Sequence, residues 1–122
     1  MMKSQQLKLG LHRKNRRVWL DNRLLLEGAG FRVGFKYDVK YCHLSRVIFL
    51  SLDAEGARKV AQKKGTDPII DLNSTKVGWA LGDCSEILVE YNQGIIEISP
   101  VEEKERSIHE LASAFKTFED KA

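Results

Sequence analysis

Several features that define well-known classes of protein are scarce in this sequence. It has only two cysteines, Cys42 and Cys84, which are too few and too far apart for a disulfide framework or a four-ligand zinc site. Its longest apolar run, near Val47–Leu50, is too short to span a bilayer. The N-terminus lacks the charged and then apolar pattern of a signal peptide. We therefore expect a cytoplasmic protein with no membrane partner.

The residue patterns of common active sites are missing as well. His12, His43 and His109 lie far apart, and neither His-x-x-x-His nor Cys-x-x-Cys occurs. There is no Gly-x-Ser-x-Gly motif and no glycine-rich phosphate loop. Cys42 precedes His43 directly, but neighbours in a strand face opposite ways, which favours two surface residues over a thiol–imidazole pair. The sequence thus predicts no catalytic residue, no metal and no cofactor, and it favours a non-enzymatic protein.

The charge of the chain is divided unevenly along its length. The 122 residues, 43% hydrophobic and 30% charged, are typical of one compact domain and carry a formal charge of +3. Residues 1–65 hold 15 lysines and arginines against 5 acidic residues, whereas residues 66–122 hold 5 against 12. The basic half suits a polyanion. The acidic half suits a protein partner or limits nonspecific binding.

One pattern of residues occurs twice, from Arg17 to Leu50 and from Pro68 to Ile98. The matched positions are Leu20-Asp21 with Leu72-Asn73 and Gly30 with Gly82 at an offset of 52, Val39-Lys40-Tyr41 with Val89-Glu90-Tyr91 at 50, and Val47–Ser51 with Ile95–Ser99 at 48. Stepwise deletions in loops are typical of diverged copies of one unit. Chance similarity between two βαββ segments is the alternative.

Each copy predicts two strands, a short helix and a hairpin. Periodicity and turn residues predict strands over 7–11, 18–20, 35–41, 47–52, 58–61, 68–72, 87–91 and 95–98, and helices over 23–29 and 75–81. The segment 12–17 has no apolar residue and is predicted as a turn, with Trp19 after it in the core. Helix caps are expected at Asp21 or Asn22 and at Asn73 or Ser74, and glycines at the helix ends. For residues 53–65 a strand is favoured over a helix.

The predicted organisation has three parts: a first unit over 1–52, a second over 53–99, and a C-terminal helix over 100–122. Ser99, Pro100 and Glu102 are typical of a helix start. The candidate partner-binding residues of this helix form an apolar stripe, Ile108, Leu111, Phe115 and Phe118. The stripe packs on the domain's own core, on a second copy or on a foreign protein, so both a monomer and a homodimer stay open.

The order of elements in Arg17–Leu50 resembles the AbrB/MazE/SpoVT swapped-hairpin family, and Leu26–Phe31 resembles the Ala-Gly-Phe helix end of the related SymE-like group. Counting both copies, the resemblance covers about Leu7 to Ile98. The family's Ile-Pro before the helix is replaced here by Leu20-Asp21 and Leu72-Asn73, where a cap residue stands for the proline. The resemblance implies a mainly β fold of the α+β class, in which two tandem units form one pseudo-symmetric barrel.

By the same resemblance, basic residues on the first hairpins of each copy bind DNA, which is favoured over RNA. The candidate residues are Lys8, Arg13, Lys14, Arg16, Arg17, Arg23, Arg58, Lys59, Lys63 and Lys64. Lysine and arginine neutralise phosphates, and arginine also reads guanine edges. The expected function is that of a small transcription regulator or antitoxin. The alternatives are a SymE-like RNA-cleaving toxin and a mobile-element inhibitor that binds a host nucleoprotein complex through the acidic half.

Overall fold

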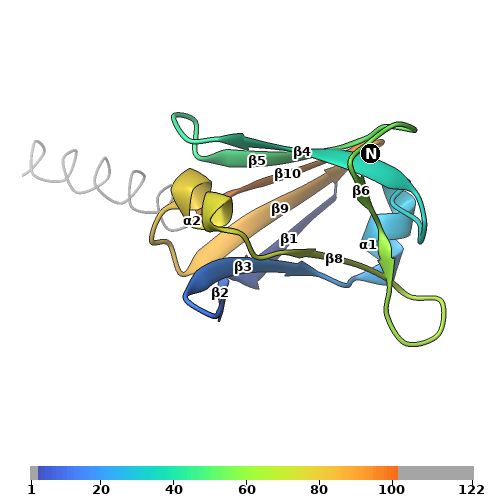
Figure 1. The fold of residues 1–122 in the computed structure, drawn as a ribbon, viewed down its shortest axis with the longest axis horizontal. Helices are drawn as coiled ribbons and strands as arrows, with labels where there is room; N and C mark the ends of the chain where they lie inside the picture. The colour runs from blue at the N-terminus through green and yellow to red at the C-terminus, as the bar shows by residue number, and fades with distance from the viewer. Residues whose placement is uncertain (1–2, 102–122) are drawn as a thin grey trace, which may run out of the picture.

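The computed structural model describes residues 3–101, which form mostly β-strands (Figure 1). In chain order the elements are β1 (Lys3–Lys8), β2 (Gly10–His12), β3 (Asn15–Leu20), α1 (Arg23–Gly28), β4 (Lys36–Cys42), β5 (Val47–Leu52), β6 (Arg58–Lys59), β7 (Ala61–Gln62), β8 (Pro68–Leu72), α2 (Thr75–Leu81), β9 (Glu86–Asn92) and β10 (Ile95–Pro100). The α+β class with mainly β content is confirmed. Residues 58–61 are not helical, as expected, but they form two short strands, β6 and β7, separated at Val60.

The strands lie in two antiparallel sheets. One has six strands in the order β1-β9-β10-β5-β4-β6, and the other has four in the order β2-β3-β8-β7. Among the described residues the expected closed barrel is not found. Leu9 and Val60 explain the difference, because each is buried and interrupts a predicted strand. The pieces on either side of each interruption join different sheets, so the sheets stay separate.

The strand order of each sheet is symmetric with respect to the two halves of the chain. Each strand of the first half lies as far from one edge of its sheet as its second-half counterpart lies from the other edge. The counterparts are β1 and β6, β2 and β7, β3 and β8, β4 and β9, and β5 and β10. The registers agree as well. Val39 lies opposite Leu50 in one hairpin, and Val89 lies opposite Ile98 in the other, at offsets of 50 and 48. The edge strands are exchanged, since β1 pairs with β9 and β6 pairs with β4. Neither half therefore contains a complete sheet.

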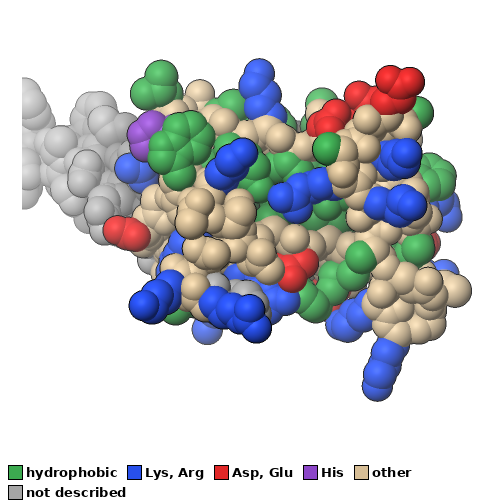
Figure 2. All heavy atoms as spheres, viewed as in Figure 1, with side chains coloured by type: hydrophobic (Ala, Val, Ile, Leu, Met, Phe, Trp, Pro, Cys, Tyr) green, Lys and Arg blue, Asp and Glu red, His purple; other side chains and the backbone are tan. Residues whose placement is uncertain are grey.

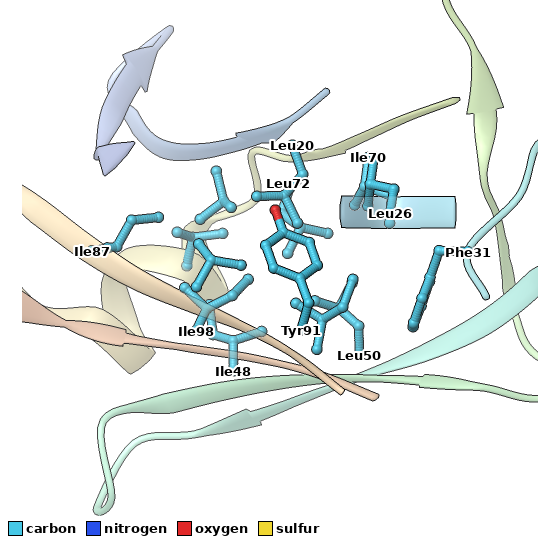
Figure 3. Close-up of a cluster of buried hydrophobic side chains, with 14 of the residues drawn as sticks. Leu20, Leu26, Phe31, Ile48, Leu50, Ile70, Leu72, Ile87, Tyr91 and Ile98 are labelled. Atoms are coloured by element: carbon cyan, nitrogen blue, oxygen red, sulfur yellow. The ribbon is translucent and has the colours of Figure 1, made fainter. Parts of the chain in front are cut away.

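The core lies between the two sheets and draws on both halves (Figure 3). Alternate residues of β3 and β8 face alternate residues of β5, β9 and β10, as the period of a half-buried strand requires. The fully buried side chains of these strands include Val18, Leu20, Ile48, Leu50, Ile70, Leu72, Ile87, Val89, Ile96 and Ile98. Helix α2 packs against β3, β4 and β5, and α1 packs against β8 and β9, so the helices close opposite ends of the core (Figure 1).

The helix ends follow the predicted chemistry in most details. The Asn22 side chain caps α1 by accepting a hydrogen bond from the Leu25 N–H at 3.1 Å. Ser74 stands at the N-cap of α2, but its side chain makes no capping hydrogen bond. Gly30 and Gly82 follow the two helices with φ of 94° and 74°, a region that glycine adopts without strain.

The predicted start of the C-terminal helix, at Ser99 and Pro100, is wrong. Strand β10 continues to Pro100, which lies opposite Ile87, so Ser99 and Pro100 belong to the strand. Proline is tolerated there because it sits at the end of the strand. From residue 102 on, the expected helix lies outside the described residues, together with Ile108, Leu111, Phe115 and Phe118. Within residues 3–101, no helix has the length and apolar character needed to cross a membrane.

Candidate nucleic-acid interface

Arg13 and Lys14 form the tip of the β2–β3 hairpin. His12 pairs with Asn15, which leaves two residues for the turn, and their φ angles are 48° and 73°. These values belong to the type I′ turn, whose twist matches that of the two strands. Both side chains are exposed and form no ion pair within residues 3–101. The six-residue turn expected over 12–17 is therefore wrong, and the basic tip is narrower.

Arg17 is engaged within the protein. Its Nε and Nη2 atoms donate to the two carboxylate oxygens of Asp71 at 2.8 and 2.9 Å. Its guanidinium also lies 4.2 Å from the centre of the Trp19 ring. The hydrogen bond with Asp71 raises the pKa of Arg17. This side chain links β3 of the first half to β8 of the second and is not available to a ligand without breaking that link.

Trp19 lies on the outer face of the four-stranded sheet, with 37% of its surface exposed. The expectation of a core residue is wrong because Val18 and Leu20 point inward, and the residue between them must point outward. Asp21 accepts a hydrogen bond from the Trp19 side chain. With Arg17 against the ring, Trp19 is part of a local polar cluster.

Arg16 fixes the hairpin to helix α2. Its side chain crosses the helix at Gly78, where an added Cβ would lie 3.2 Å from the Arg16 Cγ. The Nη2 atom donates to the Cys84 carbonyl, and the buried Nε finds no partner among the described residues. Lys8 lines a shallow cavity beside Arg16. The contact with Gly78 fixes the β3 strand of this hairpin against α2.

The second basic hairpin, between β7 and β8, lies at the other end of the four-stranded sheet (Figure 1). Lys63 is paired with Asp21 at 3.0 Å, and this hydrogen bond lowers the pKa of Asp21. Arg23 lies 3.6 Å from Asp67 and 3.4 Å from Glu27. Lys64 is exposed and has no ion pair within the described part of the chain. Most of the charge at this end is balanced locally.

The remaining two candidates, Arg58 and Lys59, form β6 at the edge of the six-stranded sheet. Lys59 lies opposite Lys36, and Arg58 lies opposite Tyr37. The structure thus distributes the ten predicted residues over three places: Lys8, Arg13, Lys14, Arg16 and Arg17 near α2, Arg23, Lys63 and Lys64 at the opposite end, and Arg58 and Lys59 at the sheet edge. It does not bring them together on one surface.

Residues that the sequence reasoning missed join the first of these groups. Trp79 of α2 stacks with His43, from the β4–β5 turn, with ring centres 4.8 Å apart and planes at 18°. Lys76 lies on the same helix, and Arg46 lies against Gly82 at its end. We call the set Arg13, Lys14, Arg16, Arg46 and Lys76 the basic end. Figure 2 shows Lys and Arg side chains gathered where Figure 1 places the β2–β3 hairpin. The sequence did contain a signal for this site. Val77, Ala80 and Leu81 are the buried positions of α2, so Trp79 on the same helix is left on its outer side.

Residues 3–101 contain no group of three or more His, Cys, Asp or Glu side chains arranged to hold a metal. No family model matches the chain. The comparison with curated proteins gives no match, and neither does the comparison with solved structures.

Proposed function

We propose that this chain is a small nucleic-acid-binding protein of the AbrB-like type, a regulator or antitoxin that contacts phosphates through the Arg13–Lys14 tip. The proposal depends on the exposure and the backbone conformation of the two residues at that tip. Two cations stand side by side at the end of a hairpin, exposed and in left-handed backbone conformations. Strained residues of this kind concentrate at functional sites. Neutralising phosphates with such side chains releases counterions and supplies affinity without sequence information.

The strand arrangement supports two tandem swapped-hairpin units in one polypeptide. Each half passes its first strand to the sheet of the other half, β1 to β9 and β6 to β4. A unit with unpaired sheet edges needs a partner, and the second copy in the same chain supplies it. The pairing of β3 with β8 and of β5 with β10 at the centre of the two sheets agrees with such a two-fold relation.

The charge arrangement favours contact through one end of the molecule. At the β7–β8 end, Lys63 and Arg23 are paired with Asp21 and Asp67, whereas Arg13 and Lys14 have no such partners within residues 3–101. Two equal contacts on a palindromic site need two equal basic surfaces. We therefore propose a one-sided complex, with a single basic end on the nucleic acid.

The test is a binding titration with a labelled DNA duplex over a salt series. With three to five phosphate contacts, the logarithm of the association constant should fall with log salt at a slope of about −3 to −4.5. Arg13→Ala with Lys14→Ala should weaken binding and reduce that slope by about 2. A matched variant, Lys36→Ala with Lys40→Ala, removes the same charge from the outer face of β4 and should change binding less.

Two results would overturn the proposal. One is the absence of binding to any nucleic acid at low salt. The other is an equal loss of affinity in the two double variants, which would mean that net charge alone sets the affinity.

A further inference from the structure

The stack of Trp79 and His43 joins two segments that lie far apart in the sequence. The Nδ1 atom of His43 donates to the Trp79 carbonyl at 2.6 Å, while the two rings stack at 4.8 Å. The turn of the β4–β5 hairpin is thereby fixed against α2. An aromatic ring held in this way loses little conformational freedom when a ligand stacks on it.

Trp79 remains accessible despite this contact. One face of its ring is covered by His43, yet 54% of the residue is exposed. The accessible surface must then include the opposite face of the ring. Buried tryptophans contribute large apolar areas to cores, so a tryptophan left this open on a short helix is a candidate contact for a ligand.

The surroundings of Trp79 are basic. Its neighbour Gly78 lies under Arg16, which belongs to the same hairpin as the Arg13–Lys14 tip. Lys76 and Arg46 lie on and beside the same helix. A flat aromatic surface flanked by cations is the combination that single-stranded nucleic acids require, with stacking for the bases and positive charge for the backbone.

We infer that Trp79 is a stacking platform for an unpaired base of single-stranded nucleic acid, with phosphates further along the same strand held by Arg13 and Lys14. His43 is a positioning residue that holds the indole. The inference rests on the proposed function and makes it more specific. A base inside a duplex has both faces covered by its neighbours and cannot stack on Trp79, so the preferred ligand contains a strand with exposed bases. Because stacking requires only a π-face, the platform tolerates any base.

The experiment uses the full chain with Trp19→Phe, which leaves Trp79 as the single tryptophan reporter. Three end-labelled probes of equal length, about twelve nucleotides, are titrated at low salt, and the anisotropy of the label gives the affinity of every variant: oligothymidylate, the same backbone with abasic residues, and a duplex. Oligothymidylate should quench Trp79 fluorescence and bind tighter than the abasic strand. Trp79→Ala should lower affinity for oligothymidylate roughly 5- to 150-fold, the worth of one stacked base, and leave affinity for the abasic strand unchanged.

Trp79→Phe serves as the conservative variant and should restore most of the affinity, because a phenyl ring also stacks. Oligouridylate in place of oligothymidylate tells whether the platform takes RNA as well as DNA. Equal binding of the base-containing and abasic strands, with no quenching, would overturn the inference and leave the proposed function standing. Failure of every nucleic acid to bind would remove both.

Discussion

The two halves of this chain share a strand register and differ in surface charge. Lys36 and Lys40 of β4 correspond, at the offset of 50, to Glu86 and Glu90 of β9. Buried positions set the register, because a slip of one residue would turn every core side chain toward solvent. Exposed positions carry no such constraint. The comparison teaches that the fold depends on what the halves have in common, and the proposed function on where they have diverged.

Some of the charged residues form ion pairs between the two halves. Each of three ion pairs links a first-half residue to a second-half residue: Arg17 with Asp71, Arg23 with Asp67, and Lys63 with Asp21. Such partly exposed pairs contribute little individually. They do, however, balance three of the ten basic residues that the sequence offered as ligand contacts. At the Arg13–Lys14 tip, no acidic side chain of residues 3–101 pairs with either of the two adjacent cations.

The largest expected effect tests whether the halves form one folding unit. Leu50 and Ile98 occupy equivalent positions, and both are fully buried in the shared core. Leu50→Ala and Ile98→Ala should each lower the free energy of unfolding by about 3 kcal/mol. Because each half completes the sheets of the other, urea denaturation followed by fluorescence and by circular dichroism should give one coincident transition.

Ile95→Ala is the control for this comparison. Ile95 belongs to the same strand as Ile98 but is 40% exposed, so its truncation should cost less than about 1 kcal/mol. Two separate transitions, or a loss confined to one half, would show that the halves are independent.

The second prediction compares the two hairpin tips. Arg13 and Lys14 have positive φ, whereas in the β7–β8 loop the residue with positive φ is Gly65. Arg13→Asn with Lys14→Gly supplies the residues that a type I′ turn prefers and should stabilise the protein by about 1 kcal/mol. The same change should weaken nucleic-acid binding, because it removes both cations. Thermal unfolding and the salt-series titration measure the two effects.

The equivalent exchange at the other tip is the control. Lys63→Asn with Lys64→Gly relieves no positive φ and breaks the contact of Lys63 with Asp21, so no stabilisation should follow. If it stabilises as much as the change at Arg13 and Lys14, strain at the first tip is not the cause. Stabilisation with unchanged affinity at the first tip would contradict its role in binding.

Much of this fold could be predicted from the sequence because the signals were local or periodic. Alternation in Val39 and Tyr41 predicted a strand, and Asn22 and Gly30 marked the ends of a helix. The breaks at Leu9 and Val60 could not be predicted, since an apolar residue in an alternating run looks like any other strand position. Whether a strand continues or crosses to a second sheet depends on tertiary packing, which outweighs local propensity.

The candidate site was predictable only in part, for a different reason. Composition located the positive charge, but the partners that balance Arg17 and Lys63 lie 54 and 42 residues away in the chain. Trp79 escaped notice because it sits in the acidic half, and only the packing of α2 beside β3 brings it to the basic hairpin. The charge pattern along the sequence shows which residues could contact a ligand. It gives no information on which of them lie side by side in the folded protein.

The smallest expected effect removes one of the differences between the halves. Asp21 corresponds to Asn73, and Asp21→Asn makes the two positions alike. An amide oxygen still accepts from the Trp19 side chain, so the change isolates the charge that pairs with Lys63. At neutral pH the loss should be about 0.5 kcal/mol, typical of an exposed pair.

The pH dependence decides whether that loss is electrostatic. In the folded protein the hydrogen bond from Lys63 holds the pKa of Asp21 below its ordinary value. The stabilisation is therefore fully present above the unfolded pKa of about 4 and disappears as the pH falls through the lower folded value. Urea denaturation at neutral pH and near pH 2 should show wild type and Asp21→Asn converging in acid. A gap that persists in acid would assign the effect to packing, and the pairs that join the halves would then act as contacts and not as charges.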